Sequence, residues 1–197
     1  MSLFRRTPIA SARWVAIDCE TSGLDASRDR LLSVGAIALT EGRIALGERF
    51  AALVRQPEPS SAANIIVHGI GGDAQRGGRP ADEVVRELGV QVGDAIPVGF
   101  HAVFDATILR RHGFAPRERW IDLAALLPAL FADRKRERTS LDHWLQAFGI
   151  PAEARHDALG DALATAQLML VALAEAKRQR LDAVEDLRAL ERDRRWL

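Results

Sequence analysis

The chain has 197 residues, of which 48% are hydrophobic and 27% are charged, as is typical of a globular domain and not of a disordered or fibrous chain. Its 27 basic and 27 acidic residues cancel to a formal net charge of +0, which excludes an overall basic field as the means of holding nucleic acid. The length predicts one domain or one domain with an appendage, and the single cysteine cannot form an intrachain disulfide.

The first part of the chain predicts a β-meander. Residues 14–18 form a short apolar run that predicts a buried strand, and residues 31–40 predict a second strand. A Glu-Gly turn then returns the chain as a third strand at 43–54. The segment between this strand and Pro80 carries two prolines and five glycines, so we expect a loop without regular elements.

The remainder of the chain predicts strands and helices in alternation. Apolar side chains recur at helical spacing after Pro80, and Ser140 is of a residue type that caps helices. The predicted strands are at 96–100 and 120–123, and the predicted helices are from Pro80 to Val92, at 104–112, from Ser140 to Phe148 and from Ala158 to about Arg195. This order indicates a mixed α/β fold with a five-stranded sheet between two layers of helices.

Two acidic side chains, Asp18 and Glu20, stand at the end of the first predicted strand. Their spacing places both on one face of the strand, while Cys19 points to the other face and into the core. Neighbouring carboxylates repel each other and lose hydration, and a cation between them would reverse that cost. The alternative interpretation of these residues alone is a pair of solvated loop acids.

Two further acids follow other predicted elements. Asp105 comes after the strand at 96–100 and begins a helix, where the helix dipole alone would also favour an acid. Near the C-terminus, Asp157 is well explained as a helix cap, whereas Asp161 lies among leucines and alanines on a turn that we expect to be half-buried. An acid on a buried face requires a partner.

The order and spacing of these residues resemble the three exonuclease motifs of the DEDD superfamily. The motifs are Asp-x-Glu-Thr-Ser-Gly-Leu from Asp18, Phe-Asp at Asp105, and His-x4-Asp from His156 to Asp161. More narrowly, the chain resembles, over about residues 13–175, the DnaQ-like branch that includes the proofreading epsilon subunit of bacterial DNA polymerase III. The chain contains no tyrosine, so His156 assigns it to the histidine (DEDDh) branch.

This resemblance implies a ribonuclease H-like fold and a 3′–5′ exonuclease that releases nucleoside monophosphates. It also implies two divalent ions, and all-oxygen ligands favour Mg²⁺ or Mn²⁺ over zinc. By the resemblance, Asp18 contacts both ions, Glu20 and Asp161 hold the ion on the side of the nucleophile, and Asp105 binds directly or through water. His156 is implied as the general base, a role that imidazole can fill at neutral pH. The alternative is a surface histidine without a catalytic role.

Substrate contacts follow from the resemblance with less support from the residues themselves. Thr21, Leu24 and His68 match positions that contact the terminal nucleotide in the family, although they equally suit a turn hydroxyl, a core leucine and a loop histidine. His101 stands where the family usually has asparagine, which leaves the preferred strand end, sugar and duplex state open. The charged run at 133–138 is expected to be a solvated loop, and its alternative role is contact with phosphates. The expected partner is a single-stranded 3′ end of DNA or RNA.

Two other functions remain open from the sequence. The first is a non-catalytic protein-interaction module on the same fold, against which the four acids and His156 argue, because a scaffold does not need buried like charges. The second is a hydrolase of small nucleotides that uses the same site.

We divide the chain into an N-terminal tail at 1–12, an exonuclease domain at 13–177 and a C-terminal helical extension at 178–197. A single helix over 158–195 would be about 57 Å long, whereas a compact chain of this length is about 40 Å across, so the helix must break near 177–181 or project. Its apolar stripe favours a homodimer, and packing on the same domain is the alternative. We find no run that matches a membrane helix or a signal peptide and expect a cytoplasmic protein.

Overall fold

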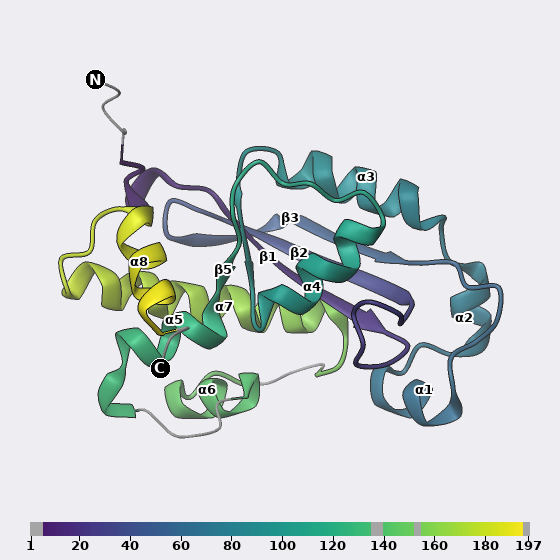
Figure 1. The fold of residues 1–197 in the computed structure, drawn as a ribbon. Helices are drawn as coiled ribbons and strands as arrows, with labels where there is room; N and C mark the ends of the chain where they lie inside the picture. The colour runs from purple at the N-terminus through teal and green to yellow at the C-terminus, as the bar shows by residue number, and fades with distance from the viewer. Residues whose placement is uncertain (1–5, 135–139, 152–154, 195–197) are drawn as a thin grey trace.

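A five-stranded mixed sheet runs through the computed structural model, which describes residues 6–134, 140–151 and 155–194 (Figure 1). The strands are β1 (Trp14–Thr21), β2 (Leu31–Thr40), β3 (Arg43–Leu53), β4 (Ile96–Gly99) and β5 (Ile121–Asp122). Their order in the sheet is β3-β2-β1-β4-β5, with antiparallel pairing among the first three and parallel pairing of β1 with β4 and of β4 with β5. The predicted meander followed by crossovers is confirmed.

Helices cover both faces of this sheet. They are α1 (Ala62–His68), α2 (Gly72–Gly77), α3 (Ala81–Val92), α4 (Ala102–Arg111), α5 (Leu123–Leu130), α6 (Leu141–Phe148), α7 (Ala158–Arg178) and α8 (Val184–Arg194), with 3₁₀ turns at Ile9–Ser11 and Ala132–Arg134. Buried residues of α3 and α4 share one core with the sheet, and those of α5, α6, α7 and α8 share the other. The predicted three-layer architecture is therefore confirmed.

Side chains of β1 alternate between the two faces of the sheet and contribute to the hydrophobic core on each face. Trp14 and Ala16 pack on the side of α7, whereas Val15 and Ile17 pack on the side of α3 and α4. Cys19 continues the second row and is buried, as predicted. By the same alternation the two acids that follow Ala16 in its row belong to the face that α7 covers.

Two predictions about the elements were wrong, namely the loop before Pro80 and the end of the first strand. The segment before Pro80 holds the short helices α1 and α2, because Ser61 caps α1 and Gly69, at φ 70°, ends it, so that serine and glycine here delimit helices. Strand β1 extends to Thr21 rather than to residue 18, because its pairing with β2 continues to the end of that segment. Of the charged run at 133–138, residues 135–138 lie outside the described part of the chain.

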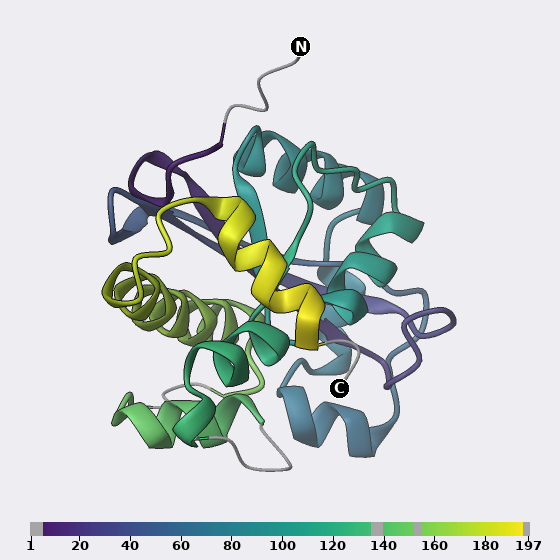
Figure 2. The same ribbon diagram turned by 60° about the vertical axis from the view of Figure 1, so that its left-hand side comes forward.

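The predicted break in the C-terminal helix is confirmed. Helix α7 ends at Arg178, and α8 begins at Val184. Figure 2 shows α8 lying across the molecule on the same side as α5, and the two helices are in contact. Val184 and Leu187 are buried in the core of the same chain, so the apolar stripe on which the homodimer prediction rested is already covered, and that prediction is not supported.

Helix α7 also corrects one expectation. Within the described residues it is long and apolar enough, by length and composition, to cross a membrane. The sequence had predicted no run of this length. Half of its apolar window is buried inside the structure, and core helices meet the same criterion.

Candidate active site

Three carboxylates meet beside β1. Asp18, Glu20 and Asp161 each offer an oxygen, and these oxygens lie within 4.8 Å of one another. The first two come from the strand, and Asp161 comes from the first turn of α7, which packs on the same face. Asp161 is buried, whereas Asp18 and Glu20 are partly exposed. A cluster of carboxylate oxygens is the donor set that Mg²⁺ and Mn²⁺ prefer, so these residues fit a divalent cation.

Gly35 allows α7 to approach the sheet at this point. It pairs with Asp18 across β1 and β2, and a Cβ atom on it would lie 2.2 Å from the backbone of Ala158, the first residue of α7. Asp157 caps the helix there, because its side chain accepts a hydrogen bond of 2.9 Å from the N–H of Gly160, as predicted. Without a side chain at Gly35, the start of α7 can sit beside the acids of β1.

Asp105 belongs to the first turn of α4 and is 4% exposed. It is not one of the three acids grouped above in the described residues, but its charge acts on Asp18. Burial raises the pKa of Asp105 to about 7, although hydrogen bonds from the Cys19 thiol and from backbone amides lower it. Asp105 therefore contacts Cys19, the residue that follows Asp18, and its charge disfavours the ionised form of Asp18.

The acids raise one another's pKa. Burial raises the pKa of Asp18 well above its ordinary value, and the charges of Asp105 and Glu20 raise it further. Burial also raises the pKa of Glu20, with a smaller contribution from the charge of Asp157. Like charges held together in this way are costly for the fold, and such costs concentrate at sites that take up a cation or perform chemistry.

Arg155 is the residue of this site that the sequence analysis missed. Its guanidinium forms an ion pair with Asp161 and lies 2.5 Å from the carboxylate of Asp142 on α6. Its charge lowers the pKa of both Asp18 and Glu20, against the effect of burial. A metal ion bound by Asp161 would compete with Arg155 for the same carboxylate. Its place just before the motif histidine was visible in the sequence, but nothing in the spacing indicated this contact.

His156 lies beside the cluster through its backbone. Its N–H donates a hydrogen bond of 3.3 Å to Oδ2 of Asp161, and its φ of 61° is in the left-handed region. The residue is exposed. The structure thus places His156 next to the acids, and its role as a base stays a prediction.

The other predicted contact residues differ in exposure. Leu24 is 96% exposed in the turn after β1, which excludes the alternative of a core leucine. Thr21 is buried, and its hydroxyl donates a hydrogen bond of 2.6 Å to the carbonyl of Gly23, as a turn hydroxyl would. His101 is exposed at the N-cap of α4, where its N–H donates to the side chain of Asp122.

His68 is 7% exposed, and both of its ring nitrogens have partners within the chain. Nδ1 accepts a hydrogen bond of 2.9 Å from the N–H of Ile70, and Nε2 lies 2.8 Å from Oδ1 of Asn64. The geometry therefore gives His68 a structural role, and its contact with substrate stays a prediction.

Comparisons with known proteins agree with this geometry. Residues 15–169 match the model of an exonuclease family. A DNA polymerase III subunit epsilon-like protein of Rhodobacter capsulatus is 34% identical over 177 residues, which cover 86% of this chain and 25% of the relative. A PolC-type DNA polymerase III of Listeria monocytogenes is 30% identical over 174 residues, which cover 86% of this chain and 12% of the relative.

A solved structure confirms the ribonuclease H-like fold. The zinc-bound complex of E. coli exonuclease I with single-stranded DNA superposes with a TM-score of 0.71 and 20% identity, over 87% of this chain and 42% of that chain. The chain thus spans a quarter or less of the two curated relatives and less than half of this structural neighbour.

Proposed function

Because the chain belongs to the exonuclease family, we propose that it hydrolyses phosphodiester bonds at the 3′ ends of single-stranded nucleic acid and releases nucleoside monophosphates. The observation that carries this proposal is the cluster of Asp18, Glu20 and Asp161, whose carboxylate oxygens lie within 4.8 Å of one another. The charge of Asp105 acts on this cluster through Asp18. The single-stranded DNA bound to the structural neighbour supports an oligonucleotide as the substrate. A scaffold for protein contact would gain nothing from holding these like charges together.

We propose two divalent ions, Mg²⁺ or Mn²⁺, as the cofactor. Asp18, Glu20 and Asp161 would hold them directly, and Asp105 would bind directly or through water. When bound, the ions would neutralise charge on the phosphoryl oxygens and assist the attacking and leaving oxygens. Arg155 would release the Asp161 carboxylate and keep its contact with Asp142 on α6.

His156 is the proposed general base. Its backbone bond to Asp161 keeps it beside the cluster, and its exposure leaves the imidazole free to accept a proton from the attacking water. Asp161 thereby contributes twice, as a ligand and as the anchor of the segment that carries the base.

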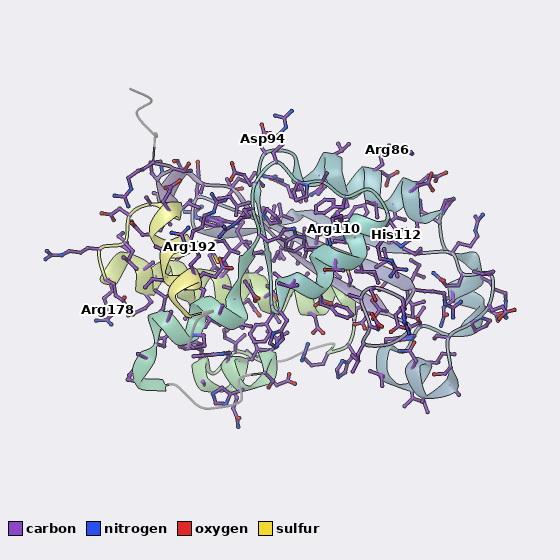
Figure 3. The ribbon with its side chains drawn as sticks, in the orientation of Figure 1. Arg86, Asp94, Arg110, His112, Arg178 and Arg192 are labelled. Atoms are coloured by element: carbon purple, nitrogen blue, oxygen red, sulfur yellow. The ribbon has the colours of Figure 1, made fainter. Side chains whose placement is uncertain are left out.

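Exposed apolar side chains near the end of β1 suit contact with unpaired bases. Leu24 follows the strand, and Ile66 and Val67 project from α1, with exposures of 96%, 83% and 55%. The arginines labelled in Figure 3, by contrast, come from helices α3, α4, α7 and α8 and are spread over the molecule. The formal net charge of +0 likewise provides no overall basic field that would hold a polyanion.

A labelled oligonucleotide tests the proposal. We expect a 5′-labelled single strand to shorten from its 3′ end in the presence of Mg²⁺ or Mn²⁺ and to stay intact in EDTA, with DNA, RNA and added Zn²⁺ run in parallel. Asp18→Asn should abolish shortening, whereas Asp73→Asn should not, because the side chain of Asp73 is fully exposed on α2. Absence of shortening by the folded protein with every metal would favour the interaction module. Cleavage of mononucleotide esters alone would favour the nucleotide hydrolase.

A further inference from the structure

A chain of hydrogen bonds joins helix α1 to the end of β1. Nδ1 of His68 accepts from the N–H of Ile70, so this nitrogen carries no proton and the proton of the neutral ring lies on Nε2. Nε2 then donates to Oδ1 of Asn64 over 2.8 Å. The amide nitrogen of Asn64 donates in turn to the carbonyl oxygen of Thr21 over 3.0 Å.

The direction of this chain fixes the orientation of the Asn64 amide. Its oxygen is held by a donor on His68, so its nitrogen faces β1. Burial lowers the pKa of His68, which keeps the ring neutral and able to play this part. A side chain without a hydrogen-bond donor at position 64 could not bond to the carbonyl of Thr21.

The bond from Asn64 reaches β1 at the point where the regular pairing of β1 with β2 is interrupted. The pairing of β1 with β2 shifts its register between Glu20 and Thr21, so the regular ladder ends at the carboxylate of the site. Thr21 then starts the turn through its bond to Gly23, and exposed Leu24 follows. A fixed carbonyl at Thr21 thus holds Glu20 on one side and the turn with Leu24 on the other.

We propose that Asn64, oriented by His68, is a positioning residue that fixes the end of β1 for metal and substrate binding. This inference rests on the proposed function. It assigns to His68 an indirect role in the site, two hydrogen bonds away from β1.

The competing explanation is that these bonds only hold α1 in place, and Gln75 supplies a matched control. Gln75 is fully buried, and its amide bonds to Ser60 and Ile70, within the same segment of α1 and α2. Through Ser60, whose hydroxyl lies 3.4 Å from Nε2 of His68, Gln75 borders the same network, but its own amide bonds neither to Asn64 nor to β1. Gln75→Ala therefore weakens the segment and leaves in place the Asn64 amide that donates to Thr21.

The test compares Asn64→Ala with Gln75→Ala in the full chain. Calorimetry with Mn²⁺, well below the melting temperature of each variant, gives the metal affinity, and oligonucleotide cleavage gives KM and kcat separately. We expect Asn64→Ala to weaken Mn²⁺ binding on the order of tenfold, as for other supporting residues of metal sites, and to raise KM. Gln75→Ala should lower the melting temperature and leave the Mn²⁺ affinity and KM unchanged, because Asn64 keeps its bond to Thr21.

Two further variants keep the proposal falsifiable. Asn64→Asp retains the acceptor for His68 and loses the donor to Thr21, so it should also weaken Mn²⁺ binding, although its added charge attracts cations. Adding His68→Ala to Asn64→Ala should cause little further loss, because the two residues act as a unit. Unchanged Mn²⁺ affinity and KM in both Asn64 variants, or equal losses in Gln75→Ala, would overturn the inference. An unmodified chain that neither binds Mn²⁺ nor cleaves would instead overturn the proposed function and this inference with it.

Discussion

Replacement of Gly35 by alanine tests how closely the site depends on the approach of α7 to the sheet. The new Cβ would lie 2.2 Å from the carbonyl group of Ala158 and 2.3 Å from the nitrogen of Leu159. These are backbone atoms, so no side chain can rotate away. An ordinary contact of 3.4 Å requires the start of α7 to retreat by about 1.2 Å.

This retreat moves Asp161 away from Asp18 and Glu20. Inserting a methyl group into a packed contact costs about 1–3 kcal/mol, so we expect Gly35→Ala to lower the free energy of unfolding by that amount. A displacement of about 1 Å in an active site can reduce the rate about 10²-fold, and we expect a comparable fall in oligonucleotide cleavage. Thermal unfolding and single-turnover cleavage measure the two effects separately.

The matched control is Gly47→Ala in β3. A Cβ on Gly47 would meet no described atom within 4 Å, so this variant should keep both the stability and the cleavage rate of the unmodified chain. If Gly35→Ala melts and cleaves like the unmodified chain, α7 does not need this close contact, and the reasoning about the assembly of the site is wrong.

Three further predictions concern charge at the site. Arg155→Met should strengthen Mn²⁺ binding by up to about tenfold, because a competing cation is removed from Asp161, whereas Arg178→Met, at the far end of α7, should not; calorimetry would show equal affinities if Arg155 has no such role. His156→Ala should reduce turnover by about 10²–10⁴-fold at unchanged Mn²⁺ affinity, and undiminished single-turnover rates at neutral pH would refute its role as the base. In EDTA, the free energy of unfolding should fall as the pH rises from about 4 to about 7, because folding raises the pKa of Asp105 from 3.8 to about 7. The stabilisation by protonated Asp105 is fully present below the pKa of the unfolded chain and is lost as the pH rises through the pKa of the folded chain. Asp105→Asn should flatten this pH dependence, measured by urea unfolding.

The sequence predicted those features that depend on local chemistry. Strand β2 has the predicted limits, and the predicted caps Ser140 and Asp157 both accept hydrogen bonds from their helices. The signals for the strand and the caps lie within one turn or one strand, so neighbouring residues suffice to interpret them. The assembly of the acids of β1 and α7 was instead implied by the order and spacing of the three exonuclease motifs, since each acid alone also suited a solvated loop or a helix end.

Features that depend on a distant partner were not predictable in this way. Strand β1 continues past Asp18 only because β2 is there to pair with it, and the need for glycine at position 35 arises from the backbone of α7. The same is true of Arg155, whose partners lie on α6 and α7, and of His68, whose neutral ring is recognised only from the N–H that faces it. In each case the residue type allows several environments, and the tertiary contact selects one.

The acidic cluster links the stability of the fold to the uptake of a cation. Burial and mutual repulsion raise the pKa of Asp18 and Glu20, and the single charge of Arg155 offsets this only in part. A divalent ion carries twice that charge and can contact several carboxylates at once, so it offsets more of the repulsion than an arginine does. An ion that binds only the folded chain raises the free energy of unfolding, and at concentrations above the dissociation constant this gain grows with the logarithm of the ion concentration. The arrangement of β1 and α7 therefore holds the acids at a cost to the fold that cation binding would recover, which is the arrangement expected of a metal-dependent nuclease and not of a passive scaffold.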